Sequence, residues 1–221
     1  MQAKHQGPIT YFVHGDNPKL LILSGTHGDE FEAAMATTRA VEAYADKLPS
    51  FVFIPQVSPS AVLSKTRVNG NQLDLNRSFF DDGIEPEVIA IMKIVRQYQF
   101  DLCIDFHEEP VYRDFYFYDS GEMDPMALTR LKNNISNLDI GLFTGIDDPD
   151  DVILTNKIED GYSPNSLAEY SLESGMFEVW AVKNRLVKRS MVMEIPESLT
   201  TEKKQSLVHT LFEDLVLPFF S

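Results

Sequence analysis

Short apolar runs alternate along this chain with longer segments in which apolar residues recur at helical spacing. Apolar runs of about four to eight residues are typical of buried strands, and the longer period is typical of helices that bury one face. The runs predict strands over residues 9–13, 20–24, 51–57, 101–106, 115–118, 176–182 and 190–195, with the first at an edge of the sheet. The periodic segments predict helices over residues 31–48, 59–64, 86–98, 125–138, 166–174 and 196–217. This alternation predicts an α/β fold, in which ligands bind beyond the carboxyl ends of the strands.

The composition then limits the class of protein. The 221 residues are 43% hydrophobic, which predicts a single domain, residues 1–221, with a full hydrophobic core. The net charge is −15 and no cluster of lysine or arginine occurs. We therefore expect neither nucleic acid nor an anionic membrane surface as a partner. The sequence leaves the oligomeric state open.

The sequence also predicts a cytoplasmic location. No apolar run approaches the length of a membrane span, and residues 1–8 lack the apolar stretch of a secretory signal. The single cysteine, Cys103, cannot form a disulfide within the chain, which suits a reducing compartment. Because Leu102 and Ile104 flank it, we expect a buried and inert thiol.

The candidate chemistry begins where the strand 20–24 gives way to the helix 31–48. His27 and Glu30 stand three positions apart there, and on a first helical turn this spacing can place both side chains on one face. An imidazole and a carboxylate on one face can hold a divalent metal ion, and Zn²⁺ takes this pair readily. Gly25 and Gly28 permit a sharp turn and a close backbone approach. Taken alone, such a pair is a weak signal, because most such pairs are a solvated ion pair or a carboxylate that interacts with the dipole at a helix start.

Two further polar residues stand at the ends of predicted core strands. His107 follows the strand 101–106 and is the candidate third metal ligand, with Asp105 or a backbone carbonyl orienting its ring. Three protein ligands with an open fourth position are typical of catalytic zinc. Glu194 ends an apolar strand, where burial would raise its pKa toward that of a general base. Glu178, in the preceding predicted strand, is its nearest competitor for that role.

Two arginines lie in one predicted loop over residues 65–82. Asn76 and Arg77 are adjacent, and Arg67 precedes them in the same loop. A guanidinium fork with an amide donor is well suited to grip a free carboxylate. A second arginine near a metal can stabilise an oxyanion.

Four segments together resemble the zinc carboxypeptidase superfamily: residues 25–30, Arg67 with residues 69–79, residues 105–107 and residues 194–196. Two branches of the superfamily resemble this chain. One contains the short bacterial carboxypeptidases, including murein peptide amidase, and the other contains aspartoacylase and succinylglutamate desuccinylase. The loop from Arg67 to Arg77 resembles the first branch more.

The resemblance implies a mixed, mostly parallel central sheet flanked by helices, and it assigns a role to most of the candidate residues. It implies one Zn²⁺ on His27, Glu30 and His107, the substrate carboxylate on Asn76 and Arg77, the oxyanion on Arg67, and Glu194 as the base. The carboxypeptidases add a loop tyrosine over the substrate; Tyr162 is the candidate, and Tyr170 competes with it.

The predicted function is that of a zinc-dependent metallopeptidase. It would hydrolyse an amide bond adjacent to a free carboxylate in a small peptide or peptide-like substrate. The alternative in the same class is an N-acyl amino acid deacylase with the same residues. A non-catalytic module that binds carboxylates is less favoured, because every chemical position is filled. A nucleotide-binding protein is a poor fit, because no glycine-rich phosphate loop follows a strand.

Overall fold

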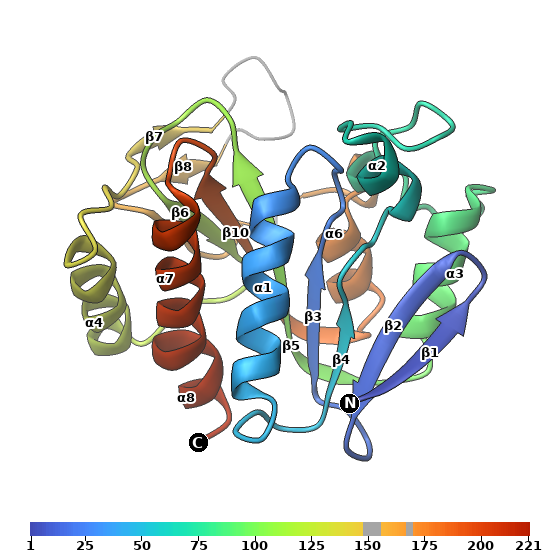
Figure 1. Cartoon of the computed structure of the whole chain (residues 1–221), viewed down its shortest axis with the longest axis horizontal. Helices are drawn as coiled ribbons and strands as arrows, with labels where there is room; N and C mark the ends of the chain where they lie inside the picture. Colours follow the sequence, from blue (N-terminus) through green and yellow to red (C-terminus); the bar gives the residue numbers. More distant parts are fainter. Residues whose placement is uncertain (148–155, 167–169) are drawn as a thin grey trace.

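The computed structural model describes residues 1–147, 156–166 and 170–221 (Figure 1). A central sheet of eight strands runs through the described part of the chain in the order β1-β2-β4-β3-β5-β10-β6-β9. The bounds, in that order, are Gln2–Gln6, Ile9–His14, Phe51–Ile54, Leu20–Ser24, Phe100–Glu109, Val187–Pro196, Tyr116–Asp119 and Tyr162–Ser163. The short strands β7 (Gly145–Ile146) and β8 (Lys157–Ile158) form a separate antiparallel pair.

The sheet is mixed, and its centre is parallel. Strands β4, β3, β5 and β10 pair in parallel, whereas β1, β2 and β4 pair antiparallel on one side and β10 and β6 pair antiparallel on the other. At the far edge, β9 pairs in parallel with β6. The three strands β3, β5 and β10 therefore bring their carboxyl ends to one edge of the sheet. The expected mixed, mostly parallel sheet is confirmed.

Helices cover both faces of the sheet, so the central strands are apolar on both sides. One face packs against α1 (Phe31–Tyr44), α4 (Pro125–Ser136) and α7 (Thr201–Leu211), which lie side by side in Figure 1. The other face packs against α3 (Pro86–Val95) and α6 (Phe177–Lys183). Residues of β3 alternate between the two cores, as the period of a strand requires. None of the described helices is long and apolar enough to cross a bilayer.

The shorter elements lie at the ends of these layers. They are α2 (Pro59–Ser64), the 3₁₀ turns η1 (Leu75–Arg77) and η2 (Leu172–Ser174), the π-helical turn η3 (Phe212–Val216) and α8 (Leu217–Phe219). The helix predicted over 166–174 falls partly on residues 167–169, which lie outside the described part. Of its described residues from 170 onward, only the 3₁₀ turn η2 is helical. This turn ends at Gly175, whose φ of +66° favours glycine. Cys103 is buried, as expected.

Two sequence predictions were wrong. The segment predicted as a strand over 176–182 is the helix α6, Phe177–Lys183. Its first five residues are all buried, and a helix that is buried all round gives the same continuous apolar run as a buried strand. The strand at 9–13 does not lie at the edge, because β1 pairs outside it. The sequence of β1, Gln2–Gln6, is mostly polar and exposed, so it carried no apolar signal.

Gly28 sits where α2 touches the turn between β3 and α1. Its backbone N–H donates to the carbonyl of Thr66 at 2.9 Å. A Cβ atom at this position would lie 1.9 Å from the carbonyl oxygen of Ala61, a separation that forces the backbone apart. Glycine therefore permits α2 and the loop that follows it to approach the turn.

We expect Gly28→Ala to lower the free energy of unfolding by about 1–3 kcal/mol, the usual cost of overpacking. Urea unfolding measures this difference. Gly70→Ala is the matched control, because its nearest neighbour would be the Cβ of Ser60 at 3.4 Å, an ordinary contact. Equal stability of the two variants would contradict the close approach at Gly28.

Candidate active site

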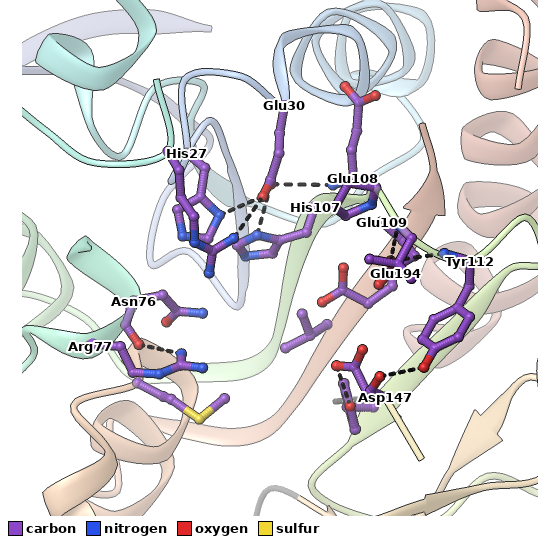
Figure 2. A pocket seen from close by; sticks show the side chains of 16 residues that line it. His27, Glu30, Asn76, Arg77, His107, Glu108, Glu109, Tyr112, Asp147 and Glu194 are labelled. Atoms are coloured by element: carbon purple, nitrogen blue, oxygen red, sulfur yellow. Dashed lines mark hydrogen bonds and ion pairs between the residues drawn. The ribbon is translucent and has the colours of Figure 1, made fainter. Parts of the chain in front are cut away.

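A cavity of about 490 Å³ opens at the carboxyl edge of β3, β5 and β10. Seven of the predicted site residues line it: His27, Glu30, Arg67, Asn76, Arg77, His107 and Glu194. Figure 2 shows the two histidines and Glu30 grouped on one side, with Asn76 and Arg77 on another and Glu194 across from them. The structure thus brings together residues that are spread over most of the chain.

His27, Glu30 and His107 converge on one point. The Nδ1 atom of His27 lies 2.5 Å from Oε1 of Glu30, and the Nδ1 atom of His107 lies 2.9 Å from Oε2. One donor atom from each residue lies within 4.8 Å of the other two, and all three residues are buried. Two imidazole nitrogens and a carboxylate oxygen form a donor set that suits Zn²⁺. The three residues can therefore hold a metal ion.

A carboxylate stands behind each histidine ring. Oδ1 of Asp74 lies 3.0 Å from Nε2 of His27, and Oδ2 of Asp105 lies 3.3 Å from Nε2 of His107. A carboxylate at Nε2 favours a proton there, which leaves the Nδ1 lone pair directed at the cavity. Asp105 was one of the two orienting groups expected for His107. Asp74 was missed, although it stands two positions before Asn76.

Charges within this group shift the pKa values of Glu30 and of both histidines. Burial alone would raise the pKa of Glu30, but His107 and His27 bring it below its usual range. Burial alone would lower the pKa of both rings, yet the carboxylates beside them raise it: Glu30 and Asp74 for His27, and Asp105 and Glu30 for His107. A metal ion must displace protons to bind such rings.

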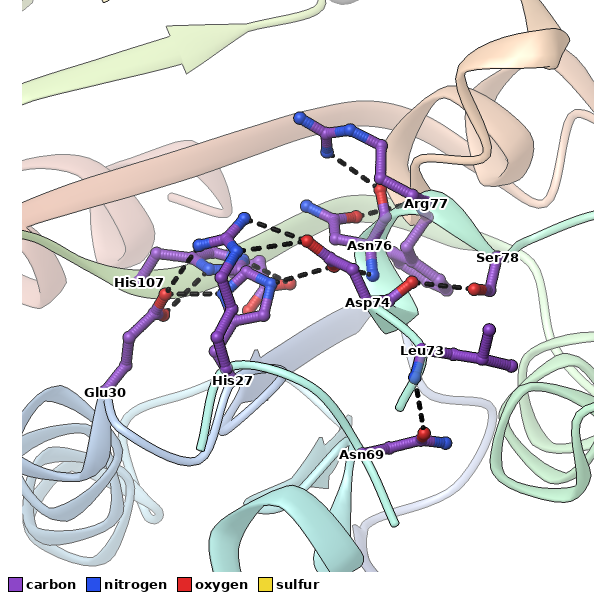
Figure 3. Close-up of polar contacts among 12 residues, drawn as sticks. His27, Glu30, Asn69, Leu73, Asp74, Asn76, Arg77, Ser78 and His107 are labelled. Atoms are coloured by element: carbon purple, nitrogen blue, oxygen red, sulfur yellow. Dashed lines mark hydrogen bonds and ion pairs between the residues drawn. The ribbon is translucent and has the colours of Figure 1, made fainter. Parts of the chain in front are cut away.

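Asp74 also organises the loop that carries the arginines (Figure 3). Its Oδ2 accepts from Nε of Arg67 at 3.1 Å and lies 3.0 Å from Nη2. Its Oδ1 accepts from the backbone N–H of Asn76 at 2.9 Å. Half of the Arg67 side chain remains exposed. The same carboxylate therefore fixes His27, Arg67 and the start of the turn η1.

Asn76 and Arg77 present donors to the cavity from η1. The backbone N–H of Phe177 donates to Oδ1 of Asn76 at 3.1 Å, which fixes the amide with its NH₂ group as the remaining donor. Arg77 donates from Nη1 to the carbonyl of Asn76 at 3.0 Å. An amide donor and a guanidinium thus lie side by side on this wall (Figure 2).

Glu194 faces the histidines from the next strand. It is paired with His107 in the parallel register of β10 and β5. Burial raises the pKa of Glu194 well above its usual range; Asp147, Glu30 and Glu109 raise it further, and His107 opposes them. A carboxyl group with this environment suits proton transfer.

Glu178, the competitor considered for the role of base, does not line the cavity. It lies in α6 and is fully buried. Its donor atoms approach those of Asp105 and His107 within 4.8 Å, and burial with Asp105 raises its pKa to about 8. Because Glu178 does not line the cavity, it would not reach a substrate there.

The structure does not bring Tyr162 into the cavity. This residue lies in β9 and is buried, and its hydroxyl donates to Oδ2 of Asp119 at 2.8 Å. Tyr170, its competitor, is buried among apolar residues and does not line the cavity either. The tyrosines that do line it are Tyr112 and Tyr118. Tyr118 ends the strand predicted over residues 115–118, but nothing in the sequence placed either tyrosine in the site.

Another wall of the cavity, called here the acidic wall, carries the carboxylates of Glu109 and Asp147. Glu109 accepts from the backbone N–H groups of Val111 and Tyr112, at 2.5 and 3.0 Å. The hydroxyl of Tyr116 lies 2.6 Å from Oε2 of Glu109 and 2.6 Å from Oδ1 of Asp147. The carboxylates of Glu109 and Asp147 therefore share the hydroxyl proton of Tyr116. This wall lies across the cavity from Asn76 and Arg77 (Figure 2).

Comparison with known proteins gives a family and a fold. A model of the succinylglutamate desuccinylase/aspartoacylase catalytic domain matches residues 16–143. Murein peptide amidase A of Vibrio campbellii (strain ATCC BAA-1116) is 26% identical over an alignment of 137 residues, and the match covers 48% of this chain and 55% of that protein. The match thus spans about half the length of this curated relative.

Solved structures share the fold at low identity. A candidate metallopeptidase from Shewanella amazonensis SB2B superposes with a TM-score of 0.76 at 16% identity, over 97% of this chain and 85% of that one. The murein-tripeptide amidase of Escherichia coli O157 superposes with a TM-score of 0.59 at 18% identity, over 92% and 85%. At such identities the likeness concerns the fold alone.

The matches fall on both branches that the sequence left open, and they confirm the zinc carboxypeptidase superfamily. The expectation of an enzyme, a metal-dependent amide hydrolase, agrees with the family model, which describes a catalytic domain, and with the curated relative, which is an amidase. The family model covers the strand-to-helix corner of His27 and Glu30, the arginine loop and His107. The chain therefore belongs to the family of succinylglutamate desuccinylase/aspartoacylase catalytic domains.

Proposed function

We propose that the chain is a zinc-dependent hydrolase that cleaves an amide bond next to a free carboxylate in a peptide or peptide-like substrate. One observation carries the proposal. The Nδ1 atoms of His27 and His107 meet the carboxylate of Glu30 in a cavity that Glu194 also lines. The convergence joins three donors for a metal with a carboxyl group able to move a proton.

His27, Glu30 and His107 would hold one Zn²⁺, since their donor atoms fit its preferences and their outer faces are already oriented by Asp74 and Asp105. Three protein ligands leave a position open. When held by these three residues, the ion would lower the pKa of a water molecule at the open position and polarise the scissile carbonyl.

The residues around the metal site would transfer protons, stabilise the oxyanion and bind the substrate carboxylate. Glu194 takes a proton from the attacking water and passes it to the leaving amine. Arg67 stabilises the negative charge that develops on the carbonyl oxygen. Asn76 and Arg77 bind the carboxylate of the substrate throughout the reaction. A substrate held in this way spans the cavity toward the acidic wall of Glu109 and Asp147.

The acidic wall favours a peptide over an acyl amino acid whose acyl group carries its own carboxylate. Such an acyl group would approach Glu109 and Asp147, and like charges at short range repel. A neutral or cationic group would not be penalised. N-acyl amino acid deacylation remains the alternative, because it would use the same catalytic residues. A module that only binds carboxylates would have no use for Glu194 beside the metal ligands.

Glu194→Gln keeps the volume of the side chain but removes the base. We expect turnover to fall by about 10²–10⁴, while Zn²⁺ content measured by atomic absorption stays at that of the wild type. Glu197→Gln is the control, because Glu197 is exposed just beyond β10. Loss of activity in Glu178→Gln with full activity in Glu194→Gln would move the role of base to Glu178.

The two arginines should differ in steady-state kinetics. Arg67→Ala should mainly lower kcat, by about 10²–10³, because it serves a charge present only in the transition state. Arg77→Ala should mainly raise KM, because the substrate carboxylate is present from binding onward. Small and equal effects in both variants would show that neither guanidinium contacts the substrate.

A substrate panel separates the two hydrolase alternatives. We expect a dipeptide with an uncharged or cationic amino-terminal residue to be hydrolysed faster than the N-succinyl derivative of the same carboxyl-terminal residue. Asp147→Asn should narrow the difference, since it removes one charge from the acidic wall. Faster hydrolysis of the N-succinyl compound by the wild type would support the deacylase instead.

A further inference from the structure

Lys204, on helix α7, is an ammonium group buried where the elements of the metal site meet. The residue is 1% exposed, and a buried ammonium is costly unless it is paired. Its Nζ donates to Oε2 of Glu108 at 2.5 Å and to Oε2 of Glu32 at 2.6 Å. Both partners adjoin proposed metal ligands, because Glu108 follows His107 on β5 and Glu32 follows Glu30 in the first turn of α1.

Glu108 joins β5 to the start of α1 through its side chain and its backbone. Its Oε1 accepts from the backbone N–H of Ala33 at 2.8 Å. Its own backbone N–H donates to Oε2 of Glu30 at 3.2 Å (Figure 2). Helix α1 begins after Glu30 without a side-chain cap of its own. Glu108 therefore supplies, from another strand, the acceptor that an N-cap side chain normally offers to the third residue of a helix.

The carboxylate of Glu108 needs a counter-charge to stay in this position, because the residue is itself 5% exposed. Lys204 provides that charge from α7. The hydroxyl of Thr201 adds a second link, since it donates to Oε1 of Glu32 at 3.0 Å. An apolar residue in place of Lys204 could fill the same space but would leave Glu108 buried without a cation.

We propose that Lys204 is a positioning residue of the metal site, which acts through Glu108 to fix Glu30 on α1 relative to His107 on β5. The inference rests on the proposed metal site, but Lys204 itself would contact neither metal nor substrate. Substitution of a residue that orients metal ligands from outside the coordination sphere typically lowers metal affinity about 10- to 100-fold.

The test is the Kd for Zn²⁺, measured by competition with a chelating indicator on variants whose folding is checked by circular dichroism. Lys204→Met keeps the aliphatic stem and removes the charge. Lys203→Met is the control, because this neighbouring lysine is partly exposed and donates to the carbonyl of Asp139 at 3.0 Å. We expect the Kd to rise about 10- to 100-fold in Lys204→Met, to stay unchanged in Lys203→Met, and to recover in part in Lys204→Arg.

An unchanged Kd in a folded Lys204→Met protein that is merely easier to unfold in urea would overturn the proposal. If Lys204→Met does not fold, Glu108→Gln decides the matter. This variant keeps an acceptor for Ala33 and removes the charge that Lys204 pairs with, so the same loss of affinity is expected and unchanged affinity overturns the proposal. Failure of the wild type to bind Zn²⁺ would overturn the proposed function, and this inference with it.

Discussion

The site depends on one buried carboxylate that lies between two histidine rings. Glu30 contacts Nδ1 of His27 through one oxygen and Nδ1 of His107 through the other. The outer nitrogen of each ring meets a further carboxylate, from Asp74 or Asp105. Carboxylates and imidazole rings thus alternate across the site, and each ring is held on both sides. Rings held in this way keep their Nδ1 atoms toward the cavity, which a metal site requires.

The sheet supplies the second constraint. Parallel strands end at a common edge, so a residue at the end of β5 and one at the same level of β10 must be neighbours. The register pairs Glu194 with His107, and a slip of one residue would turn Glu194 to the opposite face of the sheet. The backbone hydrogen bonds between β5 and β10 therefore set the position of the proposed base relative to His107. In the sequence, His107 and Glu194 each come directly after the apolar run of their strand.

These two constraints explain how much of the site could be predicted from the sequence. The spacing of His27 and Glu30 is local, although both lie in the turn just before α1 and not on its first turn. His107 and Glu194 were found because each follows an apolar run, although β5 and β10 continue two residues beyond them. The α/β class followed from the same runs, and the mixed sheet flanked by helices followed from the family resemblance. In each case the signal lies within a few residues of the position that it concerns.

The rest could not be predicted because it depends on contacts between distant segments. Asp74 meets His27, and Lys204 meets Glu108, only once the chain is folded. Helix α6 gave the apolar run of a strand because it is buried all round. Tyr162 was a candidate only through the family resemblance, and its hydroxyl donates to Asp119 instead of facing the cavity. Tertiary contacts decided each of these positions.

The most direct test of the account is X-ray absorption spectroscopy of the Zn²⁺-loaded protein at the zinc edge. We expect one ion per chain with two imidazole nitrogens and carboxylate oxygen at about 2.0–2.2 Å. In His107→Ala the imidazole contribution should fall to one ring, while His209→Ala, a change on α7 beside Tyr44, should leave the spectrum unchanged. A wild-type spectrum without imidazole scattering, or one that His107→Ala does not alter, would contradict the claim that His27, Glu30 and His107 form the metal site.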